Sequence, residues 1–443
     1  MFEFKTKLPV GEEAADMSCD YSMYTWEAQG DVKPNVVTKT DGCYVWNEKG
    51  EKRFDIGSGA VCSNVGHGQK HIQEAIKFQA DRVEYCTHDN VTDVRAALSK
   101  KLITEFAPKN MSKVIFGTGG GEMNEWALRV AKEYTGRYKI LSQYGAYHGA
   151  QYGAANLTGE GWRFTSDPPI AGHTHFFGPN YEDQVVGAKF ESEEAWTEFL
   201  LGQLKNIIEI EGPQKIAAIF FEAITGGGGA IVPPKGYYKG VRELCDKYGI
   251  LLVMDEVMVG FGRCGKNFGH EYFDVEADII TFAKGVTSAY LPFGGLMVNE
   301  KIATYFETHP APVGCTYTAH PLSCACALAT LEVYQEQNLI ENSYNMGMII
   351  ENKLKEFETI HPSVEKTRGK GLLRCYRLVK ELRENEEALN KLVQMYDDKG
   401  YCNIFFRLGN FVIAPPLSIS EDEVNMILKD TDEVLTEMDK YLK

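Results

Sequence analysis

The chain has 443 residues, of which 44% are hydrophobic and 24% are charged, and its formal net charge is −16. A chain of this length has more residues than one hydrophobic core usually organises, so we expect a large domain and at least one smaller domain. An acidic surface repels phosphate backbones and anionic lipid, which argues against nucleic acid or a membrane as a partner. The cysteines are scattered and form no C-x-x-C pair, which predicts no metal site and suits the cytoplasm. The N-terminus has no apolar signal segment, which predicts a soluble protein that is not exported.

The predicted elements follow in chain order. A turn at residues 47–50, between two extended runs, predicts a β-hairpin, and apolar residues at helical spacing predict a helix over residues 71–81. Short apolar runs then alternate with helical patterns, which predicts an α/β domain with a mostly parallel sheet covered by helices. The predicted strands cover residues 113–116, 139–142, 216–221, 250–254, 278–282 and 294–298.

The last third of the chain changes character. A long helical stretch over residues 321–355 precedes a mixed α+β segment, and a charged amphipathic helix over residues 420–442 ends the chain. We therefore predict a large domain from 56 to 320 and a smaller α+β domain from 321 to 443, which the N-terminal segment 1–55 joins.

Two charged residues follow neighbouring apolar runs of the predicted sheet. Asp255 ends the run that begins at residue 250, and Lys284 follows the run over residues 278–282. Ligands of open α/β sheets bind beyond the carboxyl ends of the strands, so both side chains are candidates for one crevice. Burial would make such a lysine more nucleophilic. Taken singly, Asp255 equally suits a surface or capping acid, and Lys284 a lysine that reaches solvent.

Three consecutive glycines, at positions 119–121, stand between a predicted strand and a helix. Their backbone N–H groups and the helix N-terminus suit a phosphate group, although a flexible turn explains the same pattern. The spacing differs from the G-x-G-x-x-G loop of dinucleotide-binding proteins. A second glycine motif, at residues 260–266, lacks the Ser or Thr that follows the lysine of a P-loop.

Together these segments resemble the class III (ω-amino acid) aminotransferases of pyridoxal 5'-phosphate (PLP) fold type I, over nearly the whole chain. Residues 255–265 are similar to the family's D-E-V-x-x-G-F-G-R-x-G motif, and residues 281–285 to its motif around the cofactor-binding lysine. Residues 314–321 are similar to its G-x-T-Y-x-x-H-P motif, and residues 147–149 match its Y-H-G.

The resemblance implies a role for each motif residue. Lys284 would form the aldimine with PLP and move the proton on the way to a pyridoxamine intermediate, while Asp255 holds the pyridine nitrogen protonated. Thr316 would reach the phosphate of the neighbouring subunit, which implies a homodimer with active sites at the interface, or a tetramer. The other implied cofactor contacts are the ring-packing residues Tyr147 and Val257, the phosphate-binding Gly120 and Gly121, and Glu222 near Asp255.

The chain departs from the family pattern at the phosphate loop. Residues 119–123 read Gly-Gly-Gly-Glu-Met where the family usually has Ser-Gly-Ser-Glu-Ala, so a hydroxyl to the phosphate is lost. Arg407 corresponds to the arginine that binds the carboxylate of the acceptor in this family. Its planar guanidinium group also suits a sulfonate. Trp26 lies in a segment similar to F-T-W-x-x-Q of enzymes acting on taurine and β-alanine. It is predicted either to line the amine pocket or to pack at the dimer interface.

The resemblance implies transamination of an ω-amino acid or amine, with taurine favoured over β-alanine and 4-aminobutyrate, to 2-oxoglutarate or pyruvate. The alternatives are a PLP-dependent aminomutase or epimerase on the same scaffold, and a regulatory protein that binds a nucleotide at its glycine loop.

Overall fold

The structure is a computed structural model that describes residues 3–166, 170–180 and 189–442. Its central element is a seven-stranded sheet with the order β4-β10-β9-β8-β7-β5-β6. Only β10 runs antiparallel to its neighbours, so the prediction of a mostly parallel sheet is confirmed. The strands are β4 (Met111–Gly117), β5 (Lys139–Gln143), β6 (His173–Phe176), β7 (Ile216–Glu222), β8 (Leu251–Asp255), β9 (Ile279–Phe282) and β10 (Gly294–Asn299).

Helices cover both faces of this sheet because its central strands are apolar on both sides. In β8, Leu251 and Val253 pack with α5 (Gly120–Thr135) on one face. Leu252 and Met254 belong to the opposite core, with α8 (Glu193–Glu211) and α9 (Tyr237–Tyr248). All five residues of β8 are buried, as two covered faces require.

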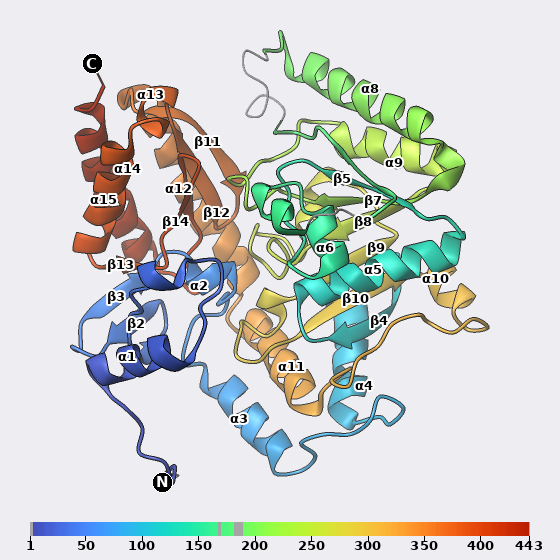
Figure 1. The fold of residues 1–443 in the computed structure, drawn as a ribbon, viewed down its shortest axis with the longest axis horizontal. Helices are drawn as coiled ribbons and strands as arrows, with labels where there is room; N and C mark the ends of the chain where they lie inside the picture. Colours follow the sequence, from blue (N-terminus) through green and yellow to red (C-terminus); the bar gives the residue numbers. More distant parts are fainter. Residues whose placement is uncertain (1–2, 167–169, 181–188, 443) are drawn as a thin grey trace.

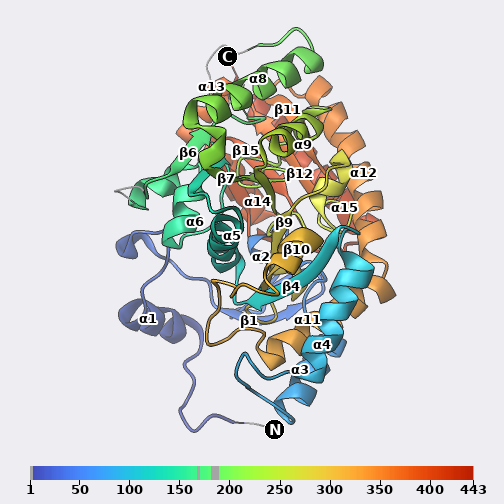
Figure 2. The ribbon, with the colours of Figure 1, turned by 90° about the vertical axis from the view of Figure 1, so that its right-hand side faces the viewer.

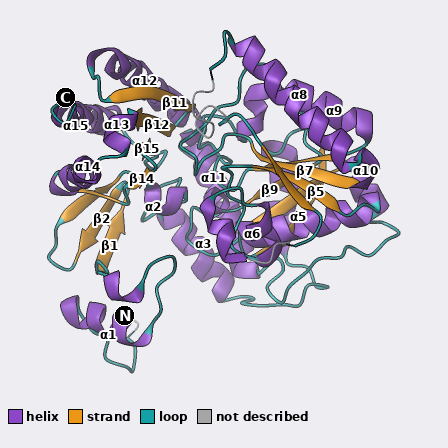
Figure 3. Ribbon diagram, turned by 45° about the horizontal axis from the view of Figure 1, so that its top comes forward, coloured by secondary structure: helices purple, strands orange, loops and turns teal. Residues whose placement is uncertain are grey.

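Two further four-stranded sheets lie apart from the central one (Figure 3). One has the order β1-β2-β3-β13 and contains the predicted hairpin, with Tyr44 paired to Phe54. The other has the order β11-β12-β15-β14. Their strands are β1 (Val37–Asp41), β2 (Tyr44–Asn47), β3 (Lys52–Asp55), β11 (Val364–Lys370), β12 (Leu373–Leu378), β13 (Tyr401–Cys402), β14 (Phe405–Arg407) and β15 (Asn410–Ile413).

The two ends of the chain meet in this part of the molecule. Strand β13, from the C-terminal third, pairs in parallel with β3, and the blue and red elements lie on the same side of Figure 1. The division into domains, with boundaries at residues 55 and 320, stays a prediction. The remaining helices are α1 (Gly11–Tyr21), α2 (Ser58–Val61), α3 (Lys70–Ala80), α4 (Asp93–Lys101), α6 (Tyr152–Leu157), α10 (Glu300–Tyr305), α11 (Pro321–Glu336), α12 (Leu339–Ile360), α13 (Lys380–Arg383), α14 (Glu386–Asp398) and α15 (Glu421–Asp439).

Some elements differ from the prediction or were missing from it. The helical stretch over 321–355 is two helices, α11 and α12, because Asn338 between them has a left-handed φ of 50°. Strand β6 was not predicted, and neither was α1, which has no buried residue and stands away from the body in Figure 2. Among the described helices, none combines the length and apolar character needed to cross a bilayer.

Candidate active site

A cavity lies where β7, β8 and β9 end. It has a volume of about 800 Å³, within the usual range for small-molecule sites. Asp255 is the last residue of β8, Glu222 is the last residue of β7, and Lys284 follows β9. All the predicted site residues except Thr316 line this cavity.

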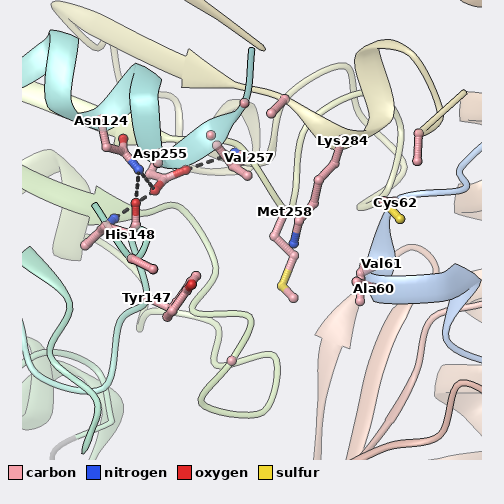
Figure 4. A pocket seen from close by; sticks show the side chains of 18 of the residues that line it. Ala60, Val61, Cys62, Asn124, Tyr147, His148, Asp255, Val257, Met258 and Lys284 are labelled. Atoms are coloured by element: carbon pink, nitrogen blue, oxygen red, sulfur yellow. Dashed lines mark hydrogen bonds and ion pairs between the residues drawn. The ribbon is translucent and has the colours of Figure 1, made fainter. Parts of the chain in front are cut away.

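Asp255 lies at the base of the site in a network of hydrogen bonds (Figure 4). Its Oδ2 accepts a bond of 2.7 Å from Asn124 Nδ2 and lies 2.8 Å from His148 Nδ1, while Oδ1 accepts from the backbone N–H of Val257 at 3.0 Å. Asn124 is itself oriented by Thr281, whose hydroxyl donates to Asn124 Oδ1 at 2.8 Å. Because partners on three segments orient the buried carboxylate, it presents a fixed acceptor to the cavity.

Lys284 enters the same cavity from the adjoining strand. Asp255 and Thr281 are paired in the sheet register, and Lys284 begins a short 3₁₀-helix three residues beyond Thr281. Its φ of 45° is rare for a residue with a side chain. Burial lowers the pKa of the Lys284 amine, which favours the neutral, nucleophilic form. Figure 4 shows Lys284 across the pocket from Asp255.

Glu222 is held by backbone donors rather than by a cation. Its two oxygens accept hydrogen bonds from the N–H groups of Tyr147 at 2.8 Å and Gly226 at 2.9 Å. Burial raises its pKa to about 7, and the negative charge of Asp255 adds to the rise. Glu222 therefore fixes the loop that carries Tyr147 at the edge of the cavity.

The glycine loop leads into the N-terminus of α5 at the cavity wall. A Cβ atom on Gly119 would meet no atom within 4 Å, so the approach to the first turn of the helix is open. A Cβ on Gly120 would lie 2.7 Å from two methyl groups of Val257, so the loop and Val257 are in close contact. An open helix N-terminus with adjacent glycines suits a phosphate group.

Two oppositely charged side chains lie together at another part of the cavity. Arg407 Nη1 donates to the buried Glu160 Oε2 in an ion pair. Burial raises the pKa of Glu160, and the charge of Arg407 opposes this rise. Trp26 also lines the cavity, with a left-handed φ of 64°.

Thr316 lies outside this cavity on an exposed segment. Its carbonyl oxygen accepts a hydrogen bond of 3.2 Å from the Tyr85 hydroxyl. Its expected role toward a neighbouring subunit stays a prediction.

Sequence reasoning missed three functional candidates. Asn124 and His148 contact Asp255, and Glu160 pairs with Arg407. The position of His148 beside Tyr147 in the Tyr-His-Gly motif was an available signal, because neighbouring loop residues often serve one site. Glu160 had no such signal, since its partner is 247 positions away.

The class of the protein follows from comparison with known families. Residues 26–435 match the family model described as aminotransferase class-III. The chain therefore belongs to the class III aminotransferases, which use PLP as cofactor. The cavity fits this group, because an amine, a buried carboxylate and an open helix N-terminus line one space.

Individual relatives have related activities. A taurine:2-oxoglutarate aminotransferase from Bifidobacterium kashiwanohense, solved in complex with PLP and glutamate, is 37% identical and has a TM-score of 0.93, with 99% of this chain and 100% of that chain covered. A diaminobutyrate–2-oxoglutarate transaminase from Halomonas elongata is 32% identical over 78% of this chain and 76% of its own length. Gamma aminobutyrate transaminase 2 from Solanum lycopersicum is 30% identical over 93% and 95%.

Proposed function

We propose that this aminotransferase moves the amino group of an ω-amino acid to a 2-oxo acid, with taurine as the favoured donor and 2-oxoglutarate as the favoured acceptor. β-Alanine and 4-aminobutyrate are the next donors, and pyruvate is the other acceptor. The main observation in support of this proposal is that Lys284, Asp255 and Arg407 line one cavity. The similarity to the Bifidobacterium taurine:2-oxoglutarate aminotransferase supports this choice of substrates.

Each residue has a defined task in the proposed reaction. Bound PLP supplies an electron sink for the electron pair released when the amine-bearing carbon loses its proton. Lys284 holds the cofactor and then moves that proton, a task for which burial prepares its amine by lowering its pKa. Asp255 keeps the ring nitrogen protonated, and the backbone N–H groups of Gly120 and Gly121 bind the phosphate.

The packing residues orient the ring and the substrate. Tyr147 and Val257 would pack against the ring, and Glu222 holds the Tyr147 loop through its hydrogen bond to the backbone. Arg407 binds the carboxylate of the acceptor through its guanidinium fork. Trp26 lines the amine side of the pocket.

We further propose a homodimer in which Thr316 completes the site of the neighbouring subunit, and a cytoplasmic location. No observation favours an aminomutase or epimerase. Those reactions need no external oxo acid, so product formed from the amine alone would support them.

Two measurements test the proposal. Taurine, β-alanine and 4-aminobutyrate are each assayed with 2-oxoglutarate and with pyruvate, and taurine with 2-oxoglutarate is expected to have the highest kcat/KM. Reduction with borohydride, followed by mass spectrometry, should then find PLP attached at Lys284. Lys284→Ala should keep the fold but lose both the attachment and transamination. Parental activity in this variant would refute the assignment of Lys284.

A further inference from the structure

The side chain of Gln151 lies against the glycine loop. A Cβ atom on Gly121 would lie 1.8 Å from Gln151 Oε1 and 3.1 Å from Nε2. Two heavy atoms that are not bonded to each other do not approach so closely, so the amide of Gln151 occupies the space that a side chain at position 121 would need. Gln151 also lines the cavity that contains Lys284.

The backbone holds Gln151 in this place. A Cβ on Gly149, whose φ is 133°, would lie 2.6 Å from Gly121 Cα, so the two chain segments are in direct contact. On the other side of Gln151, the backbone N–H of Ala154 donates to Glu125 of α5 at 2.9 Å. Residues 149–154 are therefore fastened to the first turns of α5 at two points.

The two outer glycines of the loop have different surroundings. Position 119 is open, whereas the amide of Gln151 fills the space beside position 121. A serine at either position, as in the Ser-Gly-Ser pattern, would supply a hydroxyl. At position 121 the chain instead brings a carboxamide, which carries two N–H donors, to the same space. In the described part of the chain, no hydrogen bond engages this carboxamide.

We propose that Gln151 is a cofactor-binding residue, whose Nε2 donates a hydrogen bond to the phosphate of PLP in place of a hydroxyl at position 121. A phosphate dianion offers only acceptors, so it selects the amide rotamer with Nε2 toward it. The inference rests on the phosphate site at residues 119–121 in the proposed function.

The first test measures the dissociation constant of PLP for the cofactor-free protein by titration, with pyridoxal, which lacks the phosphate, as a second ligand. Gln151→Ala should weaken PLP binding about tenfold or more, as expected for one hydrogen bond to a charged group. Its affinity for pyridoxal should stay at the parental value. Gln73→Ala, at an exposed position of α3, is the matched control and should change neither constant.

The second test uses the fact that a side chain at position 121 and the Gln151 amide would occupy the same space. Gly121→Ser introduces a hydroxyl where Gln151 lies, so it should improve PLP binding little in the parental background. In the Gln151→Ala background the serine has room and should restore most of the lost affinity. Such coupling between two positions is the signature of a common contact.

The outcomes separate two kinds of failure. If the parental protein binds pyridoxal as tightly as PLP, the phosphate site of the proposed function is wrong. If the parent prefers PLP and Gln151→Ala keeps that preference, Gln151 is not a phosphate ligand. Equal effects of Gly121→Ser in both backgrounds would also overturn the inference.

Discussion

At Glu222, the loss of water outweighs the hydrogen bonds that the carboxylate accepts. Burial and the charge of Asp255 raise its pKa to about 7, although His148 and two backbone N–H groups favour the charged form. In the unfolded chain the same group releases its proton near its ordinary value of 4.5. At pH values between 4.5 and about 7, the folded protein therefore binds more protons than the unfolded chain does. Its free energy of unfolding therefore falls as pH rises through this window.

The variant Glu222→Gln tests the direction of this pH dependence of stability, because glutamine does not titrate. The stability of the cofactor-free parent, relative to that of the variant, should fall by up to roughly 3 kcal/mol as pH rises through this window. Urea unfolding of both proteins at several pH values measures the difference. A difference that stays constant with pH would contradict the raised pKa.

If Arg407 binds the acceptor as proposed, its ion pair with Glu160 competes with the incoming carboxylate. Glu160→Gln removes the negative charge that pairs with Arg407, so the KM for 2-oxoglutarate should fall about fivefold, the equivalent of a partly buried ion pair of ~1 kcal/mol. Arg407→Met should raise this KM at least about tenfold. Steady-state kinetics with 2-oxoglutarate as the varied substrate measures both effects.

The control for this prediction is Glu74→Gln, which breaks the exposed ion pair with Lys77 on α3 and should leave the KM unchanged. An unchanged or higher KM for 2-oxoglutarate in Glu160→Gln would show that the acceptor does not displace the ion pair.

At the scale of elements, the turn over residues 24–29 is closed by a single side chain. Gln29 Oε1 accepts from the backbone N–H of Tyr24 at 2.9 Å, and Nε2 donates to the carbonyl oxygens of Tyr24 at 2.9 Å and Glu27 at 3.1 Å. These bonds support the left-handed conformation of Trp26, which lines the cavity. Gln29 is thus a positioning residue for Trp26.

We expect Gln29→Leu to have the same effect as Trp26→Ala. Each should raise the KM for the amine donor about three- to tenfold while kcat stays near the parental value, because only binding contacts are lost. Gln73→Leu on α3 is the control for the substitution type. If Trp26→Ala raises the KM and Gln29→Leu does not, the turn holds its shape without Gln29.

The elements that the sequence predicted share a strong local pattern. The strands ending at Asp255 and Glu222 have continuous apolar runs, because both faces of the sheet are covered. Strand β6 reads His-Thr-His-Phe and carries no such run, so its place beside β5 follows from tertiary pairing alone. Helix α1 buries no residue and so has no apolar stripe to detect.

The candidate site was predictable only where a motif marks it. Lys284 and Asp255 follow recognisable strands, so their convergence on one cavity could be predicted. The contact of Glu160 with Arg407 joins segments that are distant in the chain, and the contact of Gln151 with Gly121 depends on how one loop packs on a helix. Local sequence patterns carry no information on either contact.

At the scale of the whole molecule, Thr316 is the predicted site residue that does not reach its own cavity. It is exposed, and only its backbone carbonyl has a bond, to Tyr85, among the contacts described. If it binds the phosphate of a second copy, Thr316→Glu places a negative charge against that phosphate and should abolish PLP binding in the proposed homodimer. Repulsion between like charges in a buried site is the physical reason.

Mixed dimers decide whether Thr316 acts within its own subunit or across the interface. Lys284→Ala and Thr316→Glu should each be inactive alone, so the two variants are unfolded, mixed in equal amounts and refolded. If Thr316 acts across the interface, one site of each mixed dimer combines an intact Lys284 with an intact Thr316. With random assortment, activity should then return to about a quarter of the parental value, since half of the dimers are mixed and each has one working site. If Thr316 acts within its own subunit, every site keeps a defect and the mixture stays inactive. Parental protein refolded in the same way gives the reference activity.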